Sequence, residues 1–253
     1  MTGSRINIDA TLFCGQSFAW SREGDTYQAA IDGRLISFDE QTLPALLERD
    51  QYLAHYFDSA FDYETAEAHL SSLDPHLAHC IEEHRGIRIL NQDPWETTVS
   101  FILSQNNSIT RITRLYRAMA EGYGRPLGNS CYAFPRPQEL EGVSEGEFRA
   151  LGLGYRAPYL VDAVKKSEIL NEAGALDNRA ALSLLMEIKG VGEKVGSCIL
   201  LFSYGRKRIF PMDVWIKRIM AEYYQGVDPS IFAPYEGLAQ QYLFHYHRSR
   251  AGG

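Results

Sequence analysis

A glycine turn between two helical segments constrains this fold more than any other feature of the sequence. Residues 182–187 favour a helix, the turn Gly190-Val191-Gly192 follows, and a second helix is predicted to begin near Glu193. The start of that helix leaves backbone N–H groups without intrahelical partners, and the helix dipole favours an anion there. The turn therefore predicts a helical fold that can hold a phosphate, although glycine turns also join helices that bind nothing.

Composition and charge narrow the class of protein. The 253 residues are 45% apolar and 23% charged, which is typical of a globular protein with a large core and excludes a disordered chain. No apolar run could cross a bilayer and the N-terminus lacks a secretory signal, so we expect a soluble, intracellular protein. Residues 1–100 contain 6 Lys+Arg and 17 Asp+Glu, whereas residues 101–253 contain 19 and 15. The second part can therefore present a cationic face.

The spacing of apolar residues divides the chain into two regions, and the expected fold class is α+β. Residues 1–90 are predicted to form an N-terminal antiparallel β-sheet with helices, and residues 91–253 an all-α bundle. Ile6 and Ile8 alternate with polar neighbours, as in a strand. Residues 28–38 contain an Asp-Gly turn between two apolar runs, which predicts a β-hairpin.

A polar corner, Ser104 to Ser108, separates two predicted amphipathic helices in residues 95–103 and 109–119. Its composition is typical of a helix–helix turn capped by asparagine. Two helix ends that meet at adjacent side-chain amides could also hold a base or a phosphate. Spacing alone leaves both interpretations open.

Cysteine and histidine spacing gives little support for a metal site. The four cysteines, Cys14, Cys80, Cys131 and Cys198, are scattered without a C-x-x-C pair, so neither a zinc ribbon nor an iron–sulfur cluster is expected. One helical stretch carries several potential ligands, namely His76, His79, Cys80, Glu83 and His84. A solvated helix face with a buried cysteine explains that spacing better than a metal does. The sequence indicates no partner for His245 or His247.

The glycine turn is followed by Lys194 and, one helix later, by Phe210-Pro211-Met212-Asp213. A helix-hairpin-helix in residues 180–204 with an aspartate segment in residues 210–220 resembles the Gly/Pro-Asp superfamily of base-excision DNA glycosylases. Further segments, in the same order, are similar to those of one branch, the 8-oxoguanine DNA glycosylase/lyases: Cys14 to Phe18, Gly86 to Pro94, Ser104 to Asn107, Gly152 to Ala157, Gly190 to Cys198, and Pro234 to Phe244. The resemblance covers nearly the whole chain. It departs from the family pattern at Trp215, where animal members usually carry histidine, and at Gln105, where serine is usual.

The resemblance implies excision of 8-oxoguanine from duplex DNA, preferably opposite cytosine, through a Schiff base on Lys194 with β-elimination that nicks the strand. Breaking an N-glycosidic bond creates positive charge at C1′, so the site needs a nucleophile and a negative group. Lys194 lies in the first turn of a helix, where the helix field favours the neutral amine. Asp213 occupies a predicted N-cap position, and its carboxylate could also stabilise the cationic sugar.

The resemblance also implies which residues surround the flipped base. Cys198 and Phe244 would lie against its two faces, and Gln240 would contact its Watson–Crick edge. The Gly15 carbonyl would accept from N7–H of 8-oxoguanine and meet a lone pair in guanine. That mismatch would cost about 1–3 kcal/mol.

Residues expected to contact DNA elsewhere lie in the polar corner, beside a predicted wedge and in the hairpin: Asn106, Arg111, Tyr155, Arg156, Gly190, Gly192 and Val195. Tyr155 would fill the gap beside the flipped base. The two arginines would suit an orphan cytosine, because its O2 and N3 atoms both accept hydrogen bonds. They could instead bind only phosphates.

No cofactor and no catalytic metal is expected. The hairpin carbonyls near Met186, Ile188 and Val191 are candidates for a structural cation. The expected partner is double-stranded DNA containing 8-oxoguanine, with no membrane contact, and the protein is expected to be a monomer.

Two alternatives remain at this point. An alkylpurine DNA glycosylase of the same superfamily usually lacks the lysine and works through aspartate and water, so Lys194 is the discriminating residue. A non-catalytic helix-hairpin-helix DNA-binding module would not need Lys194, Asp213, Gln240 and Phe244 together.

Overall fold

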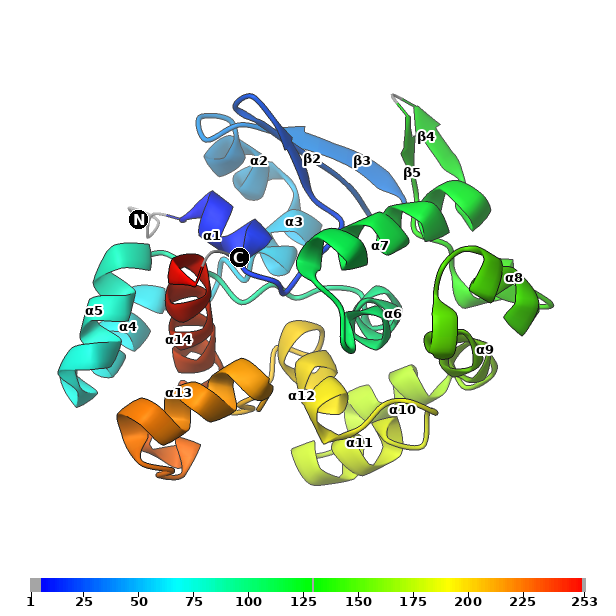
Figure 1. Cartoon of the computed structure of the whole chain (residues 1–253). Helices are drawn as coiled ribbons and strands as arrows, with labels where there is room; N and C mark the ends of the chain where they lie inside the picture. Colours follow the sequence, from blue (N-terminus) through cyan, green and yellow to red (C-terminus); the bar gives the residue numbers. More distant parts are fainter. Residues whose placement is uncertain (1–5, 129, 252–253) are drawn as a thin grey trace.

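The computed structural model describes residues 6–128 and 130–251. An antiparallel sheet of β1 (Ser21–Glu23), β2 (Thr26–Ile31) and β3 (Arg34–Phe38), in that order, lies at one side of a largely helical molecule (Figure 1). The helices before residue 90 are α1 (Ile8–Phe13), α2 (Leu43–Arg49), α3 (Gln51–Tyr56), α4 (Tyr63–Leu73) and α5 (Pro75–His84). This arrangement confirms the α+β class.

In the described residues after 90, the regular elements are helices apart from a ribbon of β4 (Pro126–Gly128) and β5 (Cys131–Tyr132). Its helices are α6 (Pro94–Ser104), α7 (Ile109–Tyr123), α8 (Glu145–Ala150), α9 (Ala157–Lys165), α10 (Ile169–Ala175), α11 (Asn178–Leu185), α12 (Glu193–Phe202), α13 (Val214–Tyr224) and α14 (Glu236–Arg250). Three short 3-10 helices are η1 (Pro137–Leu140), η2 (Gly154–Arg156) and η3 (Pro229–Phe232). Within the described ranges, no helix is long and apolar enough to span a bilayer.

The predicted hairpin is confirmed. β2 pairs with β3 so that Ile31 lies opposite Arg34. The two turn residues, Asp32 and Gly33, have φ values of 51° and 66°. These left-handed values are the ones that a two-residue type I′ turn requires.

The predicted strand at Ile6 and Ile8 is wrong, because α1 begins at Ile8. The Asn7 side chain caps this helix by accepting the Ala10 N–H at 3.0 Å. Ile8 and Leu12 are then one turn apart and both buried. A pattern of only two alternating apolar residues is too short to distinguish a strand from the start of a capped helix.

Two hydrophobic cores hold the chain together. The smaller core lies under the sheet and includes Trp20 and Phe38. The larger core joins the helices and includes Leu70 of α4 and Leu77 of α5. Although α4 and α5 precede residue 90, they pack with the later helices, and α5 lies against α14. The expected division near residue 90 stays a prediction, since the larger core extends across it.

The polar corner joins α6 to α7 as a tight turn. Asn106 takes a left-handed φ of 50°. Asn107 Nδ2 donates to the Leu103 carbonyl at 2.8 Å and so satisfies the end of α6. The N-cap of α7 is Ser108, whose hydroxyl accepts the Arg111 N–H at 3.4 Å. An asparagine therefore caps the first helix, but a serine, not an asparagine, caps the second.

The predicted hairpin between α11 and α12 is also confirmed, with α12 beginning at Glu193. Gly190 has a φ of +84°, and a Cβ there would lie 2.3 Å from the Tyr159 ring. Only glycine fits this position without a shift of α9. In Figure 1, α12 lies between α6 and α7 on one side and α13 and α14 on the other. The helix α12 therefore runs through the middle of the molecule, whereas the residues at its start, Gly192 and Glu193, are exposed.

Candidate active site

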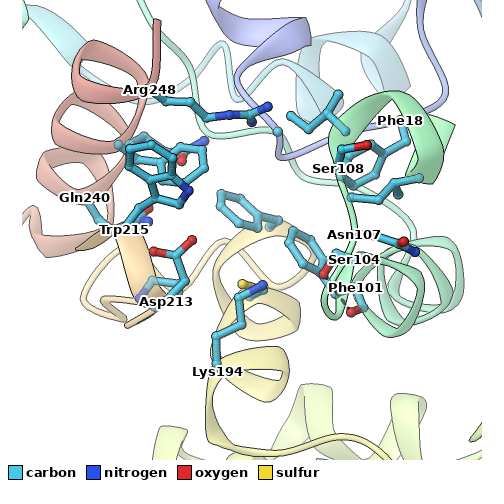
Figure 2. Close-up of a pocket in the computed structure, with 18 of the residues that line it drawn as sticks. Phe18, Phe101, Ser104, Asn107, Ser108, Lys194, Asp213, Trp215, Gln240 and Arg248 are labelled. Carbon is cyan, nitrogen blue, oxygen red and sulfur yellow. Dashed lines mark hydrogen bonds between the residues drawn. The ribbon is translucent and has the colours of Figure 1, made fainter. Parts of the chain in front are cut away.

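One pocket of about 340 Å³ lies where α6, α7, α12, α13 and α14 meet (Figure 2). All six residues predicted to act on the flipped nucleotide line it: Gly15, Lys194, Cys198, Asp213, Gln240 and Phe244. These residues come from four separate segments of the chain. Their convergence is a result of the tertiary fold, and their individual roles stay predictions.

Lys194 occupies the first turn of α12, two residues after the N-cap Gly192. Its side chain is half-buried and reaches into the pocket, with Nζ 5.0 Å from the centre of the Phe101 ring (Figure 2). Cys198 lies one turn further along α12 and is 3% exposed. Burial raises the pKa of the Cys198 thiol to about 11, against a lowering effect of the nearby Lys194 charge. The pocket therefore presents an amine beside an uncharged thiol at neutral pH.

Asp213 is the N-cap of α13, as predicted. Its Oδ1 accepts the Ile216 N–H at 2.8 Å, which fixes the direction of the carboxylate. Figure 2 shows Asp213 and Lys194 facing the same space from two different helices. A negative group and an amine thus border a single cavity.

Gln240 and Phe244 lie one turn apart on α14 and both line the pocket. Gln240 is 5% exposed. Its buried Oε1 accepts no hydrogen bond from the described part of the chain. A buried acceptor without a partner costs about 1–3 kcal/mol, so this oxygen suits a ligand that supplies an N–H group.

Gly15 follows α1 and has a φ of +90°. A Cβ there would lie 3.2 Å from Ile109 Cδ1 and 3.5 Å from Phe244 Cε1. A side chain at this position would be strained and would reduce the space beside the Phe244 ring. The absence of a side chain leaves the backbone of this residue open to a planar ligand.

Three further residues, Phe101, Trp215 and Arg248, also line the pocket. The sequence did not indicate Phe101 or Arg248 as pocket residues. It indicated Trp215 only as a departure from the family pattern. The Arg248 guanidinium lies 5.6 Å from the centre of the Phe244 ring. Arg248 follows Gln240 and Phe244 at the same four-residue spacing on α14, and that periodicity could have identified it.

The predicted DNA-contacting residues near the polar corner differ in exposure. Tyr155 is 46% exposed, and its hydroxyl donates to the Gln105 carbonyl at 3.1 Å. Arg156 is only 3% exposed, with Nε donating to the same carbonyl at 3.0 Å. Arg111 is exposed, and its Nη2 makes one long contact of 3.4 Å with the Gly152 carbonyl. Arg111 can therefore reach DNA directly, whereas the Arg156 guanidinium would first have to leave the corner.

The hairpin residues also divide into two kinds. Gly192 is exposed, and a Cβ there would meet nothing within 4 Å. The Val195 side chain is buried in the larger core. Only the backbone N–H of Val195 can therefore serve the predicted phosphate contact.

Comparisons with known proteins agree with this geometry. A "Probable N-glycosylase/DNA lyase" of Methanothermobacter thermautotrophicus is 34% identical over 210 residues, which cover 72% of this chain and 65% of the relative. The chain thus spans slightly less than two thirds of that relative. A solved structure of MBOgg1 in complex with a low-affinity DNA ligand has a TM-score of 0.90 at 34% identity, covering 99% of this chain and 94% of that one. The Clostridium acetobutylicum 8-oxoguanine glycosylase/lyase, solved with double-stranded DNA containing cytosine opposite 8-oxoguanine, has a TM-score of 0.86 at 29% identity, covering 98% and 93%.

Sequence families cover most of the chain. The HhH-GPD superfamily of base excision DNA repair proteins matches residues 99–230. Together with a helix-hairpin-helix whose lysine shares a pocket with a capping aspartate, this match defines a base-excision DNA glycosylase. The 8-oxoguanine DNA glycosylase N-terminal domain matches residues 1–98. The chain therefore belongs to the 8-oxoguanine DNA glycosylase family of that superfamily.

Proposed function

We propose that this protein excises 8-oxoguanine from duplex DNA through an imine at Lys194 and then nicks the strand. One observation carries the proposal: a single pocket is lined by the Lys194 amine, the Asp213 carboxylate and the buried, unpartnered amide oxygen of Gln240. Family membership supports the choice of lesion. An alkylpurine glycosylase usually lacks a lysine at this position and works through aspartate and water.

The proposed chemistry uses Lys194 and Asp213 in turn. The neutral Lys194 amine attacks C1′ of the sugar through its Nζ lone pair, and the bond from C1′ to the base breaks with its electrons leaving on the base. The departing base takes up the proton that Nζ loses as the new bond forms. The Asp213 carboxylate stabilises the positive charge that develops on the sugar. The adduct then opens to an imine, loss of a C2′ proton follows, and the 3′ phosphate leaves as its C–O bond breaks.

Recognition of the lesion is proposed to depend on polar groups at two edges of the base. The Gly15 carbonyl accepts from N7–H of 8-oxoguanine, an atom that carries a lone pair in guanine. Gln240 Oε1 accepts from an N–H of the Watson–Crick edge, which would satisfy its buried oxygen. Phe244 and Cys198 lie against the two faces of the ring. Each lost polar contact would cost about 1–3 kcal/mol.

Duplex DNA is the proposed partner, held at the α12 N-terminus by the backbone N–H groups of Gly192 to Val195. Tyr155 is the proposed wedge, and Asn106, Arg111 and Arg156 the proposed contacts of an orphan cytosine. The exposure of Arg111 and Tyr155 supports these assignments. The C. acetobutylicum structure with cytosine opposite 8-oxoguanine supports the choice of opposite base.

We further propose that the protein acts as an intracellular monomer without a cofactor. A structural cation on the hairpin carbonyls also stays a proposal. The Ile188 carbonyl already accepts the Val191 N–H at 2.9 Å, but its second lone pair could still bind a cation. No step of the proposed reaction involves such an ion.

Borohydride trapping on an 8-oxoguanine duplex tests the proposal. The wild-type protein should form a covalent adduct, and Lys194→Gln should form none while still binding the DNA. Lys165→Gln, which changes an exposed lysine on α9, is the matched control and should trap normally. An undiminished adduct in Lys194→Gln would place the nucleophile elsewhere.

A second substrate tests the alkylpurine alternative. Single-turnover excision should strongly favour 8-oxoguanine over 3-methyladenine and guanine. Equal rates on 3-methyladenine would support the alternative enzyme. Absence of excision from every substrate, with DNA binding intact, would support a non-catalytic module.

A further inference from the structure

Three potential metal ligands gather on the seam between α5 and α14, outside the pocket lining. His76 and Cys80 lie one turn apart on α5, and His247 lies on α14. The two imidazole Nε2 atoms are 2.9 Å apart. Cys80 Sγ lies 3.8 Å from His76 Nε2, and all three ligand atoms lie within 4.8 Å of one another.

This cluster corrects one expectation from the sequence, which indicated no partner for His247 or His245. His247 contacts His76, and His245 packs against His84 with ring centroids 4.4 Å apart. The potential ligands of α5 do not form one set. His79 contacts Glu83 at 3.2 Å and is half exposed, and His84 lies against His245, so His76 and Cys80 are the two that cluster with His247. The third ligand, His247, lies 167 positions after Cys80 in the sequence. The spacing of residues within one helix could not have indicated it.

We propose that His76, Cys80 and His247 bind one Zn²⁺ ion, which clamps α14 onto α5. Zinc binds imidazole nitrogen at about 2.0–2.1 Å and thiolate sulfur at about 2.3 Å, so its tetrahedral ligands lie about 3.3–3.6 Å apart. Two of the three observed separations, 2.9 and 3.8 Å, bracket this range, and the third is at most 4.8 Å. Small side-chain rotations would suffice to bind the ion, and a water molecule would complete the tetrahedron.

The surroundings hold the ligands in place. The Tyr223 ring stacks on the His76 ring at 4.0 Å with an angle of 7°. Both imidazoles are partly buried, which limits their movement. Cys80 is fully buried, so its sulfur is protected from solvent.

Binding must displace the thiol proton. Formation of the Zn–S bond releases that proton to solvent. The ion would stabilise the helix that also carries Gln240 and Phe244.

The test is metal binding by the full-length protein after treatment with a chelator and dialysis. Co²⁺ should bind at one ion per chain with a thiolate-to-cobalt charge-transfer band, and Zn²⁺ should displace it. Zn²⁺ should also raise the melting temperature. Cys80→Ala should abolish the charge-transfer band, and His247→Asn should weaken Co²⁺ binding by about tenfold or more.

His79→Asn is the matched control, because it removes a histidine of the same helix that lies outside the cluster. It should bind Co²⁺ like the wild type. The melting temperature of each metal-free variant shows whether that variant is folded. If Cys80→Ala does not fold, His247→Asn still tests the proposal, because His247 is only partly buried. Unchanged Co²⁺ binding in Cys80→Ala and His247→Asn, or no binding by the wild type, would overturn the proposal and leave a hydrogen-bonded histidine pair.

Discussion

The Gln105 side chain donates from Nε2 to the Gly190 carbonyl at 3.0 Å, and this bond joins the polar corner to the hairpin turn. The carbonyl of the same residue accepts from the Tyr155 hydroxyl and from Arg156 Nε. One residue therefore connects the corner, the hairpin and the proposed wedge. Gln105 is also where the chain departs from the family pattern, since serine is usual there.

Gln105→Ala should weaken this connection. We expect the free energy of unfolding to fall by about 0.5–1.5 kcal/mol, the usual contribution of one hydrogen bond. DNA affinity should fall as well, because the hairpin would lose its link to the corner. Urea unfolding and fluorescence anisotropy measure the two effects. Gln51→Ala, at an exposed position of α3, is the control, and equal effects of the two changes would contradict the prediction.

Asp213→Asn separates the charge of this residue from its capping role. Asparagine caps a helix about as well as aspartate, so the melting temperature should hardly change. The single-turnover rate should fall about a hundredfold or more, because the negative stabiliser is lost. Asp177→Asn makes the same change at the N-cap of α11, away from the pocket, and should leave the rate unchanged. Near-normal turnover of Asp213→Asn would leave it only a capping role.

Gln240→Ala should weaken binding of the damaged base without preventing the reaction at the sugar. Loss of the amide should weaken binding of 8-oxoguanine DNA by about 1–3 kcal/mol, while trapping persists at high protein concentration. An abasic-site duplex provides an internal control, because it has no base to contact. Strand nicking of that duplex should match the wild type. A similar loss on both substrates would show that the change disturbs the pocket as a whole.

The two arginines near the corner should behave differently when replaced. Arg111→Ala should flatten the preference for cytosine over the other opposite bases, with stability within about 0.5 kcal/mol of the wild type. Arg156→Ala should also destabilise the fold by about 1–3 kcal/mol, since the half-buried Gln105 carbonyl would keep only its hydrogen bond from Tyr155. Single-turnover rates against the four opposite bases, with urea unfolding, separate the effects. Equal wild-type rates against all four bases would refute the cytosine assignment.

Arg248→Met should slow excision of 8-oxoguanine. In the structure a Cβ on Gly15 would lie 3.4 Å from Arg248 Nη1, so the guanidinium lies beside the proposed position of the lesion. A charged donor there can bind the 8-oxo oxygen, and its loss should cost about 1.5–3 kcal/mol. We expect kcat/KM to fall about tenfold or more, with nicking of abasic DNA unchanged. An unchanged kcat/KM would limit Arg248 to packing against Phe244.

Local chemistry made several features predictable from the sequence. The Asp32-Gly33 turn, the hairpin at Gly190 and the Asp213 cap each depend on residues within about one turn of one another. The family resemblance identified the pocket residues, but it could not show that the amide oxygen of Gln240 is buried without a partner. The strand predicted at Ile6 and Ile8 failed because the side chain of Asn7 made a helix cap there.

The sequence by itself determined the hairpin and the capping aspartate, because turns and caps are set by neighbouring residues. The class of enzyme was indicated by the resemblance to a known family. Only the tertiary structure decided that Arg156 is buried, that Arg248 lies in the pocket and that His247 meets His76 and Cys80. Each of these contacts joins residues far apart along the chain. Their proximity depends on how helices pack around a shared core, and spacing along one segment carries no information about that packing.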